Sequence, residues 1–339
     1  MDMPAAIRTV LERHDLSQDD MTSVMKTIMT GEATSAQIGG FLVGLRMKGE
    51  SIDEITAAAQ VMRDLATGVS VTGDHVVDIV GTGGDSLSTF NISTASCFIV
   101  AAVGGKVAKH GNRSVSSSSG SADLLEQAGV NLNITAEQVS QCIEQVGVGF
   151  MFAPLHHSAM KHAIGPRKEM GVRTIFNVLG PLTNPAGAQN QLLGVFSPDL
   201  VEPLANVLKN LGSNHVMVVH SDDGMDEISI GAATKVAELK DGNIKTYTIS
   251  PEDFDMREAD IKQLAVDGAE QSLGMISLIF DGHTGPARDI VLLNAGAAIY
   301  VAGLATSHSA GIEKAKEVLD SGAAKQKLSE LVELTTSFK

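Results

Sequence analysis

Tryptophan is absent from this chain of 339 residues, which also has only two tyrosines. Aromatic side chains on which unpaired bases would stack are therefore scarce. Basic residues are few as well: 25 lysines and arginines against 40 aspartates and glutamates give a net charge of −15. Because nucleic acids are bound through a basic face, we expect no nucleic-acid partner, although a small basic pocket is compatible with this charge.

Cysteine and long apolar runs are also scarce. Cys97 and Cys142 are the only thiols, too few for a disulfide framework and without the spacing of a zinc site, so a reducing compartment fits best. No run of about 18 apolar residues is available to cross a bilayer. The N-terminal segment contains Asp2 and Glu12 and is unlike a secretory signal. We therefore expect a soluble cytoplasmic protein without a membrane partner.

The chain does contain enough apolar residues for a large core, with 43% hydrophobic and 19% charged residues. Its length predicts two domains, or one large domain with an appendage. Residues 1 to 68 carry helical signals only. Serine caps predict three helices there, over residues 21–29, 36–48 and 52–66, opened by Ser17, Ser35 and the capping box Ser51–Glu54.

Strand and helix signals alternate after residue 75, which predicts an α/β domain with a mainly parallel sheet. The predicted strands are 76–80, 106–108, 147–152, 191–195 and 215–220, and the predicted helices are 93–103, 122–128, 135–146, 199–211 and 311–320. A hairpin is expected over 236–240 and 244–249, because Asp241-Gly242-Asn243 favours a tight turn.

Residues 161–179 have a helical pattern again and end at Gly180-Pro181, followed by Pro185. We expect this segment to return to the N-terminal helices. The predicted domains are thus a helical one, 1–68 with 161–185 packed against it, and an α/β one formed by 74–160 and 186–339.

A glycine-rich stretch, Gly81-Thr82-Gly83-Gly84-Asp85, directly follows the first predicted strand. Glycines let the backbone approach a ligand and direct its N–H groups at an anion. In open α/β sheets ligands bind at the carboxyl ends of strands. The spacing matches neither a Walker A loop nor the dinucleotide fingerprint, and a plain strand-to-helix turn is the alternative.

Two further stretches suit an anion with several phosphate oxygens. Asn91-Ile92-Ser93-Thr94 opens a predicted helix, where phosphates bind, although ordinary N-capping explains the same residues. Lys109-His110-Gly111-Asn112-Arg113 and the serines that follow concentrate positive charge and hydroxyl donors within an acidic chain. A solvated flexible loop is the alternative for this second stretch.

Carboxylates and one arginine complete the candidate site. Asp226 and Glu227 offer neighbouring oxygen ligands for Mg²⁺, with an exposed acidic loop as the alternative. Arg167 is suited to a bidentate grip on a carboxylate, with a surface charge as the alternative.

Taken together, these stretches resemble the anthranilate phosphoribosyltransferases. The resemblance rests on VVDIVGTGGD, TFNIST, KHGNRSVSSSSGSADLLEQAG, GVRTIFNVLGPLTNP and MDEIS, which occur in the family's order over essentially the whole chain. It implies transfer of the phosphoribosyl group of phosphoribosyl pyrophosphate (PRPP) to the amine of anthranilate, with release of pyrophosphate. It also implies a small helical domain beside a larger α/β domain, Mg²⁺ at two ions per subunit, and a homodimer formed through the helical domain.

The resemblance also assigns residues. PRPP is expected at Gly81, Gly84, Asp85, Thr89, Asn91, Ile92, Ser93, Thr94, Lys109, His110, Gly111, Asn112, Arg113, Ser114, Val115, Ser116, Ser117 and Ser121. Anthranilate is expected at Gly81, Asn112 and Arg167, with His110 and Pro181 as further walls, and the metal at Ser93, Asp226 and Glu227. Two positions depart from the family pattern: Ser86 stands where glycine is common, and Ser118 where a basic residue is common.

Two other functions compete with this hypothesis. A pyrimidine nucleoside phosphorylase would share the fold and an anion site, but TFNIST and the acidic pair favour PRPP and magnesium. A non-catalytic relative that binds nucleic acid would need a basic groove, which the charge of −15 disfavours.

Overall fold

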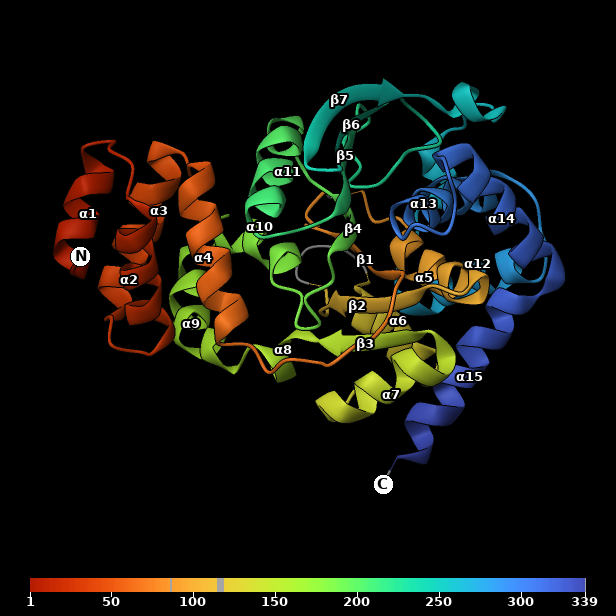
Figure 1. Ribbon diagram of the computed structural model, residues 1–339, viewed down its shortest axis with the longest axis horizontal. Helices are drawn as coiled ribbons and strands as arrows, with labels where there is room; N and C mark the ends of the chain where they lie inside the picture. Colours follow the sequence, from red (N-terminus) through yellow and green to blue (C-terminus); the bar gives the residue numbers. More distant parts are fainter. Residues whose placement is uncertain (86, 115–118, 339) are drawn as a thin grey trace.

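A seven-stranded sheet forms the centre of the computed structural model, which describes residues 1–85, 87–114 and 119–338. The strand order is β3-β2-β1-β4-β5-β6-β7. The first five strands in this order are parallel, and β6 runs antiparallel to both of its neighbours, β5 and β7. Figure 1 shows the helical bundle at one end of the molecule, the sheet in the middle and the C-terminal helices at the other end. The strands are β1 (Val76–Gly81), β2 (Lys106–Gly111), β3 (Val148–Phe152), β4 (Asn190–Gly194), β5 (His215–Ser221), β6 (Thr234–Lys240) and β7 (Asn243–Ile249).

The sheet separates two apolar cores, because successive side chains of a strand point to opposite faces. Met217 of β5 belongs to one core, and its neighbours Val216 and Val218 belong to the other. The first core is covered by α5 (Ile92–Val103) and α13 (Pro286–Val301). The second is covered by α11 (Val201–Asn210) and continues without a break into the N-terminal helices.

The N-terminal bundle consists of α1 (Met3–Leu11), α2 (Gln18–Met29), α3 (Ser35–Lys48) and α4 (Ile52–Asp64). The predicted caps Ser17 and Ser51 are confirmed. The predicted cap Ser35 is wrong by one residue, because Thr34 and Gln37 together form a capping box that opens α3. The last helix ends at Asp64, two residues before the predicted end.

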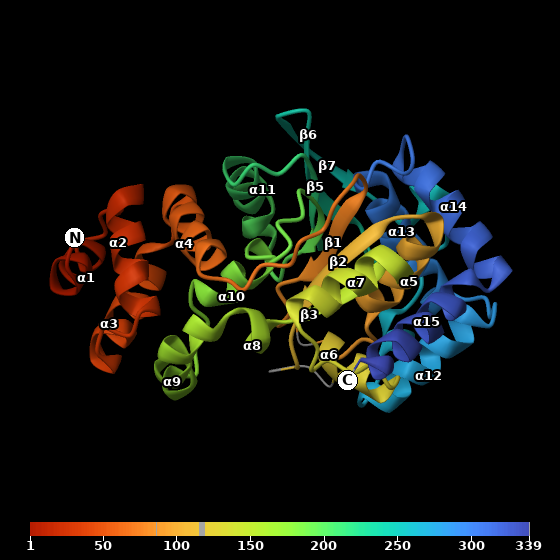
Figure 2. The same ribbon diagram turned by 60° about the horizontal axis from the view of Figure 1, so that its bottom comes forward.

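The segment predicted as one helix over 161–179 is two helices, α9 (Lys161–Met170) and α10 (Phe176–Leu179). Gly171 lies between them with φ of +60°, a left-handed conformation that ends α9. Figure 2 shows the chain leaving β3, passing through α8 (Ala153–His156) to α9 beside the bundle, and returning through α10. Helix α9 contacts α2 and α3, and α10 contacts α4, so both helices pack against the N-terminal bundle.

The remaining helices support the sheet. Those close to prediction are α5, α6 (Ser121–Gln127), α7 (Ala136–Val146), α11 after a 3₁₀ turn over Pro198–Leu200, and α14 (His308–Ser321). Five of the described α-helices were not predicted, namely α1, α8, α12 (Ala269–Phe280), α13 and α15 (Ala323–Ser337). The almost completely buried α13 has apolar residues on all sides and therefore lacks the one-sided period that marks a surface helix. Among the described helices, none combines the length and hydropathy that crossing a bilayer requires.

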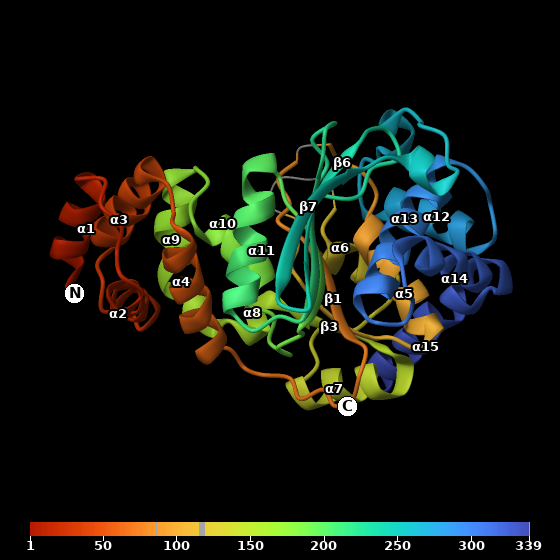
Figure 3. The same ribbon diagram turned by 45° about the horizontal axis from the view of Figure 1, so that its top comes forward.

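The predicted hairpin is confirmed as β6 and β7, with Asp241 and Gly242 at φ of 51° and 73° in the two-residue turn. Figure 3 shows this hairpin at the edge of the sheet, beside α11. Both tyrosines of the chain meet on Glu238 of β6: Tyr300 Oη lies 2.8 Å from Oε1 and Tyr247 Oη 2.9 Å from Oε2. His215 Nε2 lies 2.8 Å from Oε1. Burial alone would raise the pKa of Glu238, but these hydrogen bonds outweigh it and lower the pKa to about 2.

We expect Glu238→Gln to lower the free energy of unfolding at pH 7 by about 1–2 kcal/mol, a value reduced for the partial exposure of the site. A pKa that folding lowers from its usual 4.5 to about 2 gives stability that is complete above about pH 4.5 and is lost as the pH falls toward 2. The difference from wild type should therefore shrink at low pH.

Urea unfolding followed by circular dichroism at pH 7 and pH 3 measures this. Glu333→Gln, which changes an exposed carboxylate of α15, is the matched control. An equal deficit of Glu238→Gln at both pH values would contradict the assigned pKa.

Candidate active site

The candidate site lies at the carboxyl ends of the parallel strands, where β1 and β4 end side by side at the paired residues Gly81 and Gly194. The chain then turns through 81–85 after β1, and through 222–227 after β5. The N-terminus of α5 completes this edge. The order of the strands thus brings three separately predicted stretches together, as ligand sites in open α/β sheets require.

The acidic turn packs against the two glycines that end β1 and β4. A Cβ atom on Gly81 would lie 2.5 Å from Asp226 Oδ2, and one on Gly194 would overlap the carbonyl group of Asp226. The backbone N–H of Gly83 donates to the same Oδ2 at 2.7 Å. Only glycine therefore lets the turn approach the glycine-rich loop this closely.

Three carboxylates gather here, those of Asp85, Asp226 and Glu227. Loss of contact with water and the negative charge of Asp85 raise the pKa of Asp226 to about 7. Loss of contact with water and the charge of Asp226 raise the pKa of Glu227 to about 8. Desolvation is the larger cause of both shifts and the neighbouring carboxylates add to it, and a cation bound here would lower both pKa values again.

The donor set fits magnesium. It offers carboxylate oxygens and no nitrogen or sulfur ligand, and Mg²⁺ is usually held by one or two carboxylates together with water and substrate phosphates. Within ranges 1–85, 87–114 and 119–338, no group of three or more His, Cys, Asp or Glu is arranged to hold a metal by itself. A cation at Asp226 and Glu227 would thus depend on a ligand that supplies further oxygens.

Lys109 is a buried cation beside this cluster. Its ammonium group donates to the carbonyl of Ile79 at 2.5 Å and to Ser93 Oγ at 3.2 Å. The backbone N–H of Ser93 donates to Glu227, whose pKa the charge of Lys109 lowers in part. The second strand was predicted to end at Ala108, but β2 continues to Gly111, so the strand itself directs Lys109 toward Ser93.

A second set of polar contacts surrounds the start of α5. Asn91 Nδ2 donates to the carbonyl of Ser119 at 3.1 Å, and its N–H donates to Ser272 Oγ at 3.0 Å. Thr94 Oγ1 donates to Ser121 Oγ at 3.0 Å. Thr89 forms an isolated bridge with Ala265, whereas Ile92 is buried.

The basic loop after β2 is held at both of its ends by Asp123 of α6. Asp123 Oδ2 accepts from the N–H groups of Ser114 at 3.0 Å and Gly120 at 2.9 Å. Arg113 pairs with Glu126 and Asp123 of the same helix, and Asn112 Oδ1 accepts the N–H of Arg113 at 2.8 Å. The predicted residues Val115, Ser116 and Ser117, and the departures Ser86 and Ser118, lie outside the described residues.

A buried polar network lies on the other face of β1 and β2. Asp78 Oδ2 accepts from Asn184 Nδ2 at 2.8 Å, and burial raises the pKa of Asp78 to about 6. The rings of His110 and His157 are 5.0 Å apart, and burial lowers the pKa of His110 to about 3 and that of His157 to about 4. Both imidazoles are therefore neutral at physiological pH.

The segment that returns from the bundle contains two arginines, of which Arg173 contacts the glycine loop. Arg167 of α9 lies over the ring of Phe176, 5.0 Å from its centroid, and no carboxylate of the described residues forms an ion pair with it. Arg173 donates to the carbonyl of Gly84. Over the described part of the chain, no hydrogen bond joins Arg167 to Gly81 or Asn112 directly.

Sequence analysis missed several residues of this region. Asp78 had a signal, since a charged residue inside an apolar strand is rarely buried without a partner. Asp123 also had a signal, since it stands at the third position of a helix that Gly120 opens, as in a capping box. Gly194 and Ser272 had no local signal, because their partners Asp226 and Asn91 are distant in the sequence.

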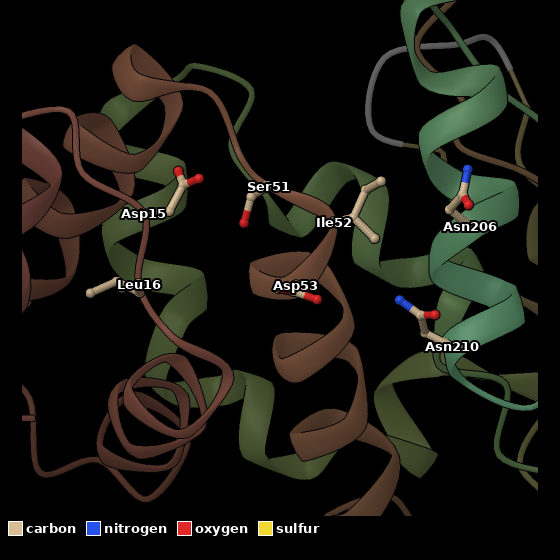
Figure 4. A pocket seen from close by; sticks show the side chains of 7 residues that line it. All are labelled: Asp15, Leu16, Ser51, Ile52, Asp53, Asn206 and Asn210. Atoms are coloured by element: carbon tan, nitrogen blue, oxygen red, sulfur yellow. The ribbon is translucent and has the colours of Figure 1, made fainter.

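A groove away from the candidate site lies between the start of α4 and α11. Figure 4 shows Asn206 and Asn210 of α11 facing Ile52 and Asp53 across it. Of the predicted site residues that the structure describes, none lines this groove.

Comparison with known proteins identifies relatives of both parts of the chain. Residues 73–325 match the family model described as the α/β domain of a glycosyl transferase family. Residues 4–66 match the model described as the helical bundle domain of a glycosyl transferase family. Two curated relatives, both named anthranilate phosphoribosyltransferase, are similar over their full length. The one from Thioalkalivibrio sulfidiphilus is 67% identical over 99% of this chain and 100% of its own. The one from Marinobacter nauticus is 57% identical over 100% of both chains.

Solved structures show the same similarity. The anthranilate phosphoribosyltransferase of Thermus thermophilus superposes with a TM-score of 0.93 at 41% identity, covering 98% of this chain and 99% of its own. The enzyme of Saccharomyces cerevisiae in complex with PRPP and Mg superposes with a TM-score of 0.90 at 26% identity, covering 99% and 98%. The same yeast enzyme in complex with 4-fluoroanthranilate has a TM-score of 0.89 at 26% identity, again covering 99% and 98%.

We expect Gly81→Ala to lower the free energy of unfolding by about 1–3 kcal/mol, because the added methyl group must displace the Asp226 carboxylate. Gly274→Ala is the matched control, since a Cβ there meets nothing within 4 Å and the residue lies inside α12. That control should gain about 0.5–1 kcal/mol. Chemical denaturation of both variants measures this, and equal stability of the two would contradict the close packing at Gly81.

Proposed function

The chain belongs to the anthranilate phosphoribosyltransferase family of glycosyl transferases, and from this membership we infer how its described residues divide between the two substrates. The reaction is transfer of the phosphoribosyl group of PRPP to the amine of anthranilate, which yields N-(5-phosphoribosyl)anthranilate and pyrophosphate in tryptophan biosynthesis. The observation that carries the assignment of residues is the packing of the glycine loop against Asp226, beside Glu227, Ser93 and Lys109.

PRPP is placed along the carboxyl edge of β1 and β2. Its pyrophosphate lies on the loop from Gly81 to Asp85, where glycine allows backbone N–H groups to face an anion. The polar residues around the start of α5, Asn91, Ser93 and Thr94, hold the ribose and the adjoining phosphates. The stretch that begins in β2 at Lys109 and runs to Ser117, with Ser121, is proposed to bind the remaining phosphate oxygens.

Mg²⁺ bound at Asp226 and Glu227, with Ser93 nearby, adds positive charge beside the leaving pyrophosphate when present. We propose two ions for each subunit, as the family resemblance implies. The need for substrate oxygens to complete the coordination explains why the protein ligands are so few.

Bond breaking is assisted by charge and alignment. As the bond between C1 of the ribose and the pyrophosphate oxygen breaks, positive charge develops on the sugar and negative charge on the leaving group. Lys109, fixed by Ile79 and Ser93, contributes a positive charge near that edge without having to reorient. The backbone N–H groups of the glycine loop add hydrogen-bond donors.

Anthranilate is placed on the side of Arg167, Asn112 and Gly81. Arg167 is free of acidic partners among the described residues, so its guanidinium is available to the substrate carboxylate. The aromatic amine is neutral at pH 7 and nucleophilic, and its proton leaves after attack. The chain therefore needs to align the amine with C1 and does not need a strong base.

The chain is proposed to work as two domains, the helical one with the 161–185 segment and the α/β one, with the substrates between them. It is proposed to form a homodimer through the helical domain, where Leu11, Val43 and Met47 expose large apolar side chains on α1 and α3. We place it in the cytoplasm. Light scattering of the purified chain, whose single-subunit mass is 35.4 kDa, tests the dimer.

The fluorescence of anthranilate tests the function directly. Purified protein, PRPP and Mg²⁺ should together remove the signal and release one pyrophosphate per anthranilate consumed, whereas mixtures that lack any one component should not. Phosphorolysis of a pyrimidine nucleoside by the same preparation, without turnover of anthranilate, would favour the phosphorylase alternative and refute the assignment.

We expect Arg167→Ala to raise the KM for anthranilate about 10- to 100-fold, because a charged hydrogen-bonding partner of the carboxylate is lost. The KM for PRPP should change less than about 3-fold. Lys168→Ala, which removes the neighbouring exposed cation of α9, is the matched control. Equal increases in both KM values for Arg167→Ala would contradict the carboxylate role.

Asp226→Asn combined with Glu227→Gln should lower kcat/KM about 100-fold or more and raise the Mg²⁺ concentration needed for half-maximal rate. The same variant should be more stable than wild type at pH 8 without substrates. An acid whose pKa is raised on folding costs stability once the pH exceeds its unfolded pKa, and the amides abolish that cost.

Steady-state kinetics and thermal unfolding at pH 8 measure both effects. Asp222→Asn, at an exposed position of the same turn, serves as the control. Wild-type kinetics in the double variant would refute the metal assignment.

A further inference from the structure

Arg173 connects the segment returning from the bundle to the glycine loop. It lies between α9 and α10, and its guanidinium donates to the carbonyl of Gly84. The same guanidinium lies over the ring of Phe196, with 4.3 Å between its central carbon and the ring centroid. The ring of Phe196 and the carbonyl of Gly84 belong to different parts of the chain, so two independent contacts hold the guanidinium.

No carboxylate of residues 1–85, 87–114 and 119–338 forms an ion pair with Arg173. This distinguishes it from Arg113, which pairs with Glu126 and Asp123, and from Arg288, which pairs with Asp320. Arg173 is partly buried and donates to a backbone carbonyl instead of a carboxylate. Although the chain has a net charge of −15, no carboxylate of the described residues pairs with this positive charge beside the phosphate-binding loop.

The loop is held at two successive glycines by groups of opposite charge. Gly83 donates its N–H to Asp226, and Gly84 offers its carbonyl to Arg173. Both glycines are left-handed, with φ of +65° and +80°, and a Cβ on Gly84 would lie 3.2 Å from a terminal nitrogen of Arg173. The direction of the loop N–H groups therefore depends on two residues. Asp226 belongs to the turn after β5, and Arg173 belongs to the segment 161–185 that returns from the bundle.

We propose that Arg173 is a positioning residue for PRPP, which sets the glycine loop in its pyrophosphate-binding conformation through the carbonyl of Gly84. The proposal rests on the proposed function and deepens it. Arg173 follows Arg167 by six residues in the same segment. One segment thus supplies a residue to each substrate: Arg167 contacts anthranilate directly, and Arg173 acts on PRPP through the loop.

The first experiment compares the kinetics of Arg173→Ala and Arg173→Lys with those of wild type. Arg173→Ala should raise the KM for PRPP about 10- to 100-fold, because the loop loses a charged hydrogen bond. The KM for anthranilate, measured at saturating PRPP, should stay within about 3-fold. Arg173→Lys should recover only part of the loss, since an ammonium group donates to the carbonyl but lacks the planar group that stacks on Phe196.

Chemical rescue separates positioning from general damage to the fold. Guanidinium chloride at about 10–50 mM, far below denaturing concentrations, should lower the PRPP KM of Arg173→Ala several-fold, whereas equal sodium chloride should not. Lys168→Ala is the matched control for loss of one positive charge in this segment and should give wild-type constants. Calorimetric titration with inorganic pyrophosphate and Mg²⁺ should show the same weakening in Arg173→Ala without any turnover.

Three outcomes would overturn the proposal. These are a wild-type PRPP KM in Arg173→Ala, a parallel rise of both KM values that guanidinium does not relieve, and unchanged pyrophosphate binding. The wild-type protein distinguishes this from failure of the proposed function: if wild type itself does not turn over anthranilate with PRPP, the function is wrong, whereas pyrophosphate binding still reports on Arg173.

Discussion

The close packing of the 222–227 turn on the glycines that end β1 and β4 is the constraint on which the site depends. Gly81 and Gly194 are paired neighbours in the parallel sheet, and neither leaves room for a Cβ atom beside Asp226. This contact delivers a carboxylate to the glycine loop and fixes the loop through Gly83. Desolvation and the neighbouring carboxylates raise the pKa values of Asp226 and Glu227, which is consistent with the cation proposed to bind there.

The two apolar cores explain how the small helical part supports this chemistry. One core lies between the sheet and α5 and α13, and the other runs from the opposite face of the sheet through α11 into the bundle. Ala163, Phe176 and Leu182 of the segment 161–185 belong to this second core, and Arg173 of the same segment contacts the glycine loop. Among the described residues, no carboxylate pairs with Arg167 or Arg173. These two cations are therefore available for the carboxylate and phosphate groups that are proposed to bind.

Much of the fold was predictable because its signals are local. Capping residues, β-branched runs and the Asp241-Gly242 turn each specify a conformation through neighbours a few residues away. The predictions failed where that condition fails. The buried α13 has no polar side to reveal its helical period. Gly171 ends α9 in the middle of a segment that was predicted as one helix. At the site, the glycine loop and the acidic pair were predicted together, and the roles given to their residues stay predictions.

The sequence by itself determined the class of fold and the order of the strands along the chain, and it predicted which stretches would bind phosphate, because these follow from residue type and short spacing. Only the tertiary structure decided which distant residues meet. Asp78 finds Asn184 across 106 positions, and Gly83 finds Asp226 across 143. Both tyrosines meet on Glu238, and Arg173 reaches Gly84. Such partners are set by strand order and by the way two cores pack, and no local signal in the chain encodes a contact of that range.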